Sequence, residues 1–145
     1  FLNTENFIQK RVKTYYWDED INCAAASLKI LSEKFDISLC GQVIDAALGM
    51  HGAGGYGAQC GLVEGPLMFM GIVGRQMNIA DNDIVACCSE FAAQFEKRFK
   101  SLLCRDLRAE GFVSWNPPHL CEKLTCETLD FSLAFVGEFI NTHTV

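Results

Sequence analysis

Apolar residues recur every three to four positions along most of the 145-residue chain, which is the period of an amphipathic α-helix. No segment shows the strict apolar–polar alternation of a half-buried strand. The pattern predicts six helices, with the fifth as the longest: about residues 4–16, 21–35, 39–48, 60–74, 81–103 and 119–141. The expected fold is therefore all-α, a compact bundle of five to six helices that forms a single domain over residues 1–145.

Short polar residues mark the expected helix starts, because their side chains accept hydrogen bonds from unpaired backbone N–H groups. Asn3 or Thr4 would cap the first helix, Asp20 or Asn22 the second, and Ser38 the third. These caps support the boundaries that the apolar pattern indicates.

Residues 60–74 are apolar almost throughout, which predicts a buried central helix. Pro66 limits how this helix can form, since proline lacks a backbone N–H group. Either the helix begins near Gly65 with Pro66 as its first residue, or Pro66 bends it.

Seven glycines fall within the seventeen residues from Gly49 to Gly65, between two helical segments. Glycine is unfavourable in a helix and accepts positive φ, so the run predicts a loop whose backbone comes close to another group. Gly52 to Gly57 also match the dinucleotide fingerprint G-x-G-x-x-G. That fingerprint requires a preceding strand and a βαβ unit, so no NAD site is expected.

Charge and hydropathy exclude several classes of protein. The net charge of −6 and the absence of a Lys/Arg cluster argue against nucleic-acid binding. No apolar run reaches the roughly 20 residues of a membrane span, and no signal pattern precedes the first helix, so a cytoplasmic protein is expected. Half of the residues are apolar, and this composition is compatible with self-association as a homodimer.

Eight cysteines are many for a cytoplasmic protein, where stable disulfides are rare and metal or redox chemistry is the usual explanation. The absence of C-x-x-C excludes compact zinc motifs, and the absence of C-x-x-C-H excludes c-type haem. Four cysteines stand at predicted helix ends, where N–H donors favour thiolates: Cys23, Cys60, Cys104 and Cys121. The other four lie within predicted helices and are expected to pack: Cys40, Cys87, Cys88 and Cys126.

Two histidines lie near these cysteines in the sequence. His51 precedes Cys60 and His119 precedes Cys121, so each is a candidate ligand or hydrogen-bond donor. A surface or structural role is the more common one for a single histidine. The sequence alone does not decide whether either histidine contributes to the cysteine site.

In this order, the cysteines and the glycine run resemble a family of redox-active proteins named for the cysteine pattern C_GCAxxG_C_C. The resemblance covers about residues 20–140 and departs from the family motif at Leu62, in place of alanine, and at Pro66. It implies redox or metal chemistry on Cys23, Cys60, Cys104 and Cys121. It rests on Asn22-Cys23-Ala24, the glycine run, Cys60-Gly61-Leu62-Val63-Glu64-Gly65 with Leu67-Met68, Phe95 to Phe99, Cys104-Arg105-Asp106-Leu107 and Cys121.

Several mechanisms are compatible with this resemblance, and whether the protein is an enzyme stays open. The favoured one is an iron–sulfur cluster or other iron centre that transfers electrons to an unidentified redox partner protein. Its sulfurs would accept hydrogen bonds from a glycine backbone formed by Gly54, Gly55, Gly57 and Gly61. Alternatives are a dithiol–disulfide couple with Cys23 as the attacking thiolate, a zinc or metal-sensing site, and a helical interaction module.

Overall fold

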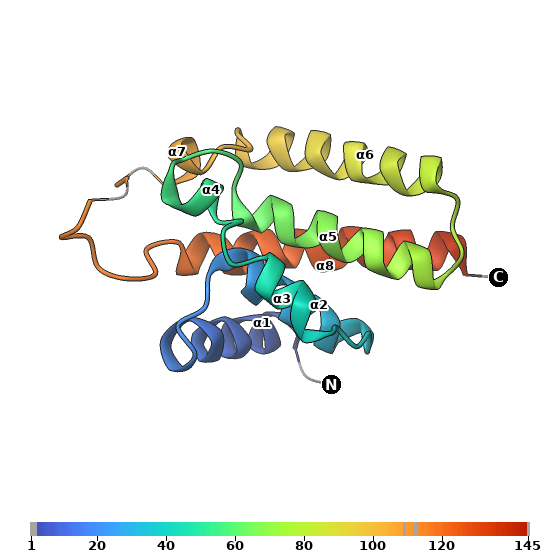
Figure 1. The fold of residues 1–145 in the computed structure, drawn as a ribbon, viewed down its shortest axis with the longest axis horizontal. Coiled ribbons are helices and arrows are strands. Elements are labelled where there is room, and N and C mark those ends of the chain that lie inside the picture. Colours follow the sequence, from blue (N-terminus) through green and yellow to red (C-terminus); the bar gives the residue numbers. More distant parts are fainter. Residues whose placement is uncertain (1–2, 109, 112, 145) are drawn as a thin grey trace.

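The computed structural model describes residues 3–108, 110–111 and 113–144. In these ranges the chain is helical and contains no strand, so the all-α prediction is confirmed. Figure 1 shows the arrangement of the elements. They are α1 (Thr4–Lys13), the π-helix η1 (Thr14–Asp18), α2 (Cys23–Phe35), α3 (Gly41–Ala46), α4 (Gly52–Gly55), α5 (Gly61–Gln76), α6 (Asp81–Phe99), α7 (Cys104–Leu107) and α8 (Glu122–His143).

Helix α5 lies at the centre of the bundle, where it contacts α2, α6 and α8 (Figure 1). Its apolar side chains are buried on several sides, including Phe69, Met70 and Val73. This burial agrees with the prediction of a central helix. Helix α1 covers the outside of α8. No helix in the described ranges is both long and apolar enough to cross a lipid bilayer.

Several predicted helix boundaries were wrong by a few residues. The first helical segment does not stop near residue 16 but continues from α1 into η1. Helix α2 begins at Cys23, because the Asn22 side chain accepts a hydrogen bond from the backbone N–H of Ala25. Helix α3 is shorter than expected, and Cys40 stands at its N-cap in place of Ser38. Pro66 lies inside α5, which already begins at Gly61.

The fifth predicted helix ends earlier than the apolar pattern indicated, and it is not the longest. Helix α6 stops at Phe99 because Lys100 adopts a left-handed conformation with φ of 76°, which cannot continue a right-handed helix. Helix α6 has 19 residues and α8 has 22. The early end of α6 matters for the site, because it leaves Cys104 free to begin a separate element.

Candidate cysteine redox site

The four cysteines at predicted helix ends line one cavity of about 260 Å³. Each stands at the N-terminal end of a helix. Cys23 and Cys104 are the first residues of α2 and α7, whereas Cys60 and Cys121 are the N-caps of α5 and α8. The sequence had placed Cys104 at the C-terminal end of the long helix, and this position was wrong because that helix ends at Phe99.

Two glycines of α5, Gly61 and Gly65, let α5 pack closely against α2, so that Cys60 lies beside Cys23. A Cβ atom at Gly61 would overlap the Cys23 sulfur and would lie 2.9 Å from the backbone nitrogen of Ala24. A Cβ atom at Gly65 would lie 2.8 Å from the carbonyl oxygen of Ala24. Since real Cβ atoms do not approach other atoms so closely, the helix contact requires glycine at both positions.

A short pairing of extended backbone joins Cys60 to Cys104. The Cys60 N–H donates to the Leu102 carbonyl at 2.8 Å, and the Cys104 N–H donates to the Ala58 carbonyl at 2.7 Å. These bonds flank an antiparallel bridge between Gln59 and Leu103. The segments before α5 and α7 are therefore held side by side, which places their two cysteines next to each other.

The glycine run forms a compact turn around the short helix α4, and four of its glycines have positive φ: Gly52, Gly54, Gly55 and Gly57. A side chain at Gly52 would collide with Cys104, since its Cβ would lie 2.8 Å from the Cys104 Cβ. The backbone of this turn therefore packs directly against Cys104. The sequence had predicted such a close approach for the glycine run as a whole.

The structure places the four glycines expected to contact a cofactor in different surroundings. The N–H groups of Gly54, Gly55 and Gly57 donate to the backbone carbonyls of Gly49, His51 and Gly52, and so they stabilise the turn itself. Gly61 borders Cys23 directly. The sulfur of Cys60 accepts a hydrogen bond from the backbone N–H of Leu62. The sequence analysis did not select Leu62 as a donor.

The thiol of Cys60 is hydrogen-bonded to the thiols of both Cys23 and Cys104. The bond with Cys104 lowers the pKa of Cys60, but the bond with Cys23 and burial outweigh it and raise the pKa to about 12. The bond with Cys60 and burial raise the pKa of Cys104 as well. Without a bound metal ion, these two buried thiols therefore keep their protons at neutral pH.

Arg108 brings a positive charge to the other side of the cavity. Burial raises the pKa of the Cys121 thiol, and the charge of Arg108 and a hydrogen bond from its side chain oppose that rise. The Arg108 Nε atom also donates to the Gly111 carbonyl at 2.7 Å, which orients the guanidinium. Sequence analysis missed Arg108, although it stands one helical turn after Cys104, a spacing that could have indicated it.

Both candidate histidines line the same cavity. The Nδ1 atom of His51 lies 3.2 Å from the Asn22 side-chain nitrogen, which also donates to the carbonyls of Ala47 and Leu48. His119 lies 3.0 Å from a carboxylate oxygen of Asp20. Each histidine therefore has a polar partner already and borders the cavity through its ring.

Tyr16 forms a further wall of the cavity that the sequence did not reveal. Its hydroxyl group is hydrogen-bonded to the Thr125 hydroxyl at 2.6 Å, and its ring stacks on the His119 ring with the centroids 4.8 Å apart. Burial raises the pKa of the Tyr16 phenol well above its usual value, and the neighbouring thiol of Cys23 adds to that rise. The neighbouring Tyr15 is buried as well. The π-helix η1 buries both tyrosines.

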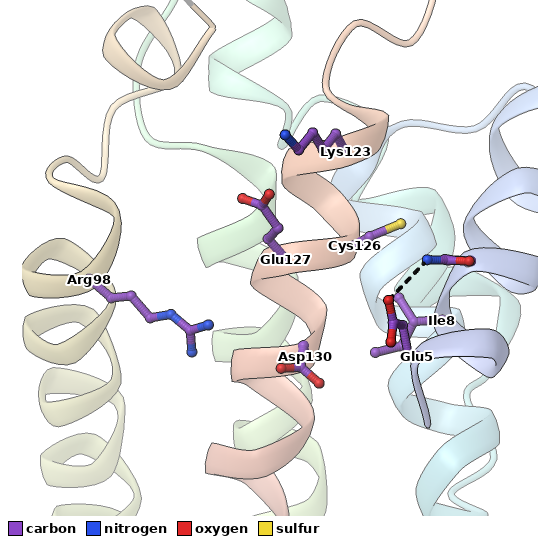
Figure 2. Close-up of a pocket in the computed structure, with 8 residues that line it drawn as sticks. Glu5, Ile8, Arg98, Lys123, Cys126, Glu127 and Asp130 are labelled. Carbon is purple, nitrogen blue, oxygen red and sulfur yellow. Dashed lines mark hydrogen bonds between the residues drawn. The ribbon is translucent and has the colours of Figure 1, made fainter. Parts of the chain in front are cut away.

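The remaining cysteines lie elsewhere. Cys40 is exposed at the start of α3, and Cys87 and Cys88 lie on α6. Cys126, on α8, lines a separate cavity of about 360 Å³, which Figure 2 shows with Arg98 of α6 on one side and Glu5 of α1 on the other. Its sulfur is partly buried there, so Cys126 is a suitable control for the site cysteines.

Within the described ranges, no three Cys, His, Asp or Glu side chains already stand as ligands around one metal position. The side chains of the four cysteines share one cavity but make hydrogen bonds to their neighbours. A metal held by these cysteines would replace the thiol protons, because cysteine binds metal ions as the thiolate.

Most of the chain matches the model of a described protein family. Residues 21–134 match the model of the family described as "Putative redox-active protein (C_GCAxxG_C_C)". No curated protein and no solved structure gives a significant match. The matched range contains all four cysteines that line the cavity. The chain therefore belongs to the C_GCAxxG_C_C family of redox-active proteins.

Proposed function

We propose that Cys23, Cys60, Cys104 and Cys121 hold an iron–sulfur cluster or another iron centre and that the protein transfers electrons. The observation that carries this proposal is the convergence of four thiols from four helix N-termini on one cavity. Cysteine thiolates are the usual ligands of iron–sulfur clusters, and four of them complete the common ligand set. Membership of a redox-active family supports the same chemistry.

The donor set fits a group held by anionic sulfur. Helices α2, α5 and α8 are 13, 16 and 22 residues long, and the positive ends of their dipoles lie at Cys23, Cys60 and Cys121. The Leu62 N–H donates to the Cys60 sulfur, and Arg108 adds a positive charge beside Cys121. These contacts stabilise thiolates once a cation has replaced their protons.

The residues of the chain would position and shield the centre. When bound, an iron centre supplies reversible one-electron redox chemistry. Cys60 and Cys104 are buried, so bulk water is excluded from that side of the cavity. Hydrogen bonds to sulfur and burial both tune the reduction potential of such a centre. The reducing cytoplasm would keep the four thiols available for iron, and we place the activity there.

Anaerobic purification followed by an absorption spectrum and iron, zinc and sulfide analysis tests the proposal. We expect sulfur-to-iron charge-transfer bands in the visible range and iron in stoichiometric amounts. A colourless protein with four free thiols after iron and sulfide have been supplied would exclude the iron centre. Stoichiometric zinc that iron does not replace would support the zinc site instead.

A dithiol–disulfide couple is a second candidate, because Cys60 is hydrogen-bonded to two neighbouring thiols. Oxidation would form one S–S bond and release two protons and two electrons to a disulfide or quinone oxidant. Differential alkylation with and without reductant, read by mass spectrometry, should then show a reversible change at Cys60 and at Cys23 or Cys104. Cys40 is exposed and serves as the internal reference. Equal labelling at the site cysteines in both states would rule out this couple.

A further inference from the structure

Helix α6 lies along one edge of the bundle, and most of its residues are exposed (Figure 1). Three of its 19 residues are buried, whereas nine of the 16 residues of α5 are buried. Helix α6 packs on α5 and meets α8 through aromatic rings. The centroid of the Phe91 ring lies 5.3 Å from that of Phe131 and 5.2 Å from that of Phe135. Phe131 and Phe135 are only half-buried, so the outer side of this contact reaches solvent.

Two adjoining hollows of about 400 and 760 Å³ lie over this contact. Gln94 and Phe131 line both of them. We call the combined surface the α6–α8 face; it extends over residues 83–100 and 131–143. Exposed alanines of both helices lie beside the phenylalanine rings in its middle. The four site cysteines line a different cavity, so the α6–α8 face is a separate feature of the molecule.

One end of the α6–α8 face is acidic. Glu138 lines the same hollow as Cys87, and Asp83 stands one helical turn before Cys87. Burial and the negative charge of Asp83 raise the pKa of the Cys87 thiol, as expected for neighbouring side chains. His143 also lines this hollow, and its Nδ1 atom is hydrogen-bonded to the Phe139 carbonyl at 2.8 Å. Both carboxylates are exposed.

The other end of the α6–α8 face is basic. Lys97, Arg98 and Lys100 line the second hollow, and all three are exposed. Arg98 also borders the cavity of Cys126, which contains acidic residues, so we assign the charge of this end to the two lysines. Glu90 stands between the two ends and accepts a hydrogen bond from a neighbouring glutamine at 2.8 Å.

The charges at the two ends are not neutralised within the chain. In the described residues, the ion pairs join other side chains and include neither the two carboxylates nor the two lysines named above. Opposite charges supplied by a partner would therefore form new contacts at both ends of the face.

A second copy of the chain is the partner that fits this arrangement. A two-fold axis sets the same surface of both copies face to face, so that residue i contacts residue j and residue j contacts residue i. The acidic end of each copy then meets the basic end of the other, and the two apolar middles pack together. A partner of uniform charge would instead be repelled at one of the ends.

We propose that the α6–α8 face is the interface of a homodimer in which the two α6 helices run antiparallel. Asp83 and Glu138 of each copy then lie opposite Lys97 and Lys100 of the other copy. The four site cysteines take no part in this contact. The dimer and the proposed iron centre can therefore be confirmed or excluded separately.

Sedimentation velocity over a range of protein concentrations tests the dimer. The full chain is kept reduced, so that the exposed Cys40 cannot link two copies through a disulfide. We expect a particle of about twice the 16.1 kDa of one chain, with a dissociation constant that rises with salt. A particle of one chain at every concentration would overturn the proposal. A monomer that carries a small molecule in native mass spectrometry would also overturn it and would assign the hollows to that ligand.

Carbodiimide cross-linking locates the contact, because it joins a lysine directly to a carboxylate without a spacer. Lys97 and Asp83 are fourteen positions apart on one helix, which is about 21 Å, so a bond between them must join two copies. We expect Lys97 or Lys100 to be linked to Asp83 or Glu138 in the cross-linked dimer. Links between copies that involve only other parts of the chain would exclude the α6–α8 face as the interface.

Charge reversal tests the complementarity of the two ends. Lys97→Glu with Lys100→Glu should raise the dissociation constant of the dimer about tenfold or more, because like charges then oppose each other. Adding Asp83→Lys and Glu138→Lys to the same chain should restore the dimer. The matched control is Lys10→Glu with Lys13→Glu, two exposed lysines with the same spacing near the end of α1. Equal effects of the two double reversals, or a fourfold variant no better than the double one, would overturn the proposed pairing.

Discussion

Replacing Cys60 by serine is expected to abolish the iron-dependent absorption of the protein and to reduce its bound iron to a substoichiometric amount. Cys60 occupies the centre of the thiol group, with hydrogen bonds to Cys23 and Cys104 and a donor at Leu62. A serine oxygen is a harder and less acidic ligand than a thiolate, and it binds iron–sulfur centres poorly. Loss of the central ligand therefore affects the whole centre.

The control for this prediction is Cys126→Ser, which makes the same chemical change in a different cavity. This variant should keep the full iron content and spectrum and lose about 1 kcal/mol of stability, as for a small change at a half-buried site. Circular dichroism should show helical folding for both variants. A Cys60→Ser protein with wild-type iron content and spectrum would exclude Cys60 as a ligand.

Gly61→Ala is expected to lower the free energy of unfolding of the metal-free protein by about 2–3 kcal/mol, because the added methyl group overpacks the interface of α2 and α5. Its Cβ would overlap the Cys23 sulfur and would lie 3.2 Å from the Ala24 Cβ. Relief of this overlap must move the start of α2 away from α5. We therefore expect Gly61→Ala also to weaken iron binding, since Cys23 and Cys60 separate.

Gly71→Ala, in the same helix, is the matched control. A Cβ atom at Gly71 would have no atom within 4 Å apart from its chain neighbours and the backbone of its own helix, so the substitution adds no overlap. Alanine should stabilise the helix there by about 0.5–1 kcal/mol relative to glycine. Urea denaturation of both variants measures the contrast. Similar stabilities for the two proteins would show that the close approach of α2 and α5 at Gly61 is not required.

The surroundings of Gly52, Gly61 and Gly65 change the interpretation of the glycine run. From the sequence, the run resembled a loop whose backbone reaches a bound group. In the structure, Gly52 makes room for Cys104, and Gly61 and Gly65 make room for α2. The glycines of this region thus act mainly by letting elements approach each other, and the sulfurs come together as a result. These glycines would therefore affect a bound cofactor indirectly, because they determine where the cysteines lie.

Local sequence signals were sufficient for the helical class, for the burial of α5 and for the selection of four cysteines that line one cavity. Helical periodicity and N-cap residues such as Asn22 act over a few neighbouring positions, and so they can be read along the chain. The tertiary structure alone decided which residues complete the site. Cys104 begins a helix because Lys100 turns left-handed and the backbone then pairs with residues 58–60. Tyr16, Arg108 and the His119–Asp20 contact reach the cavity through packing between segments far apart in sequence, which no local pattern encodes.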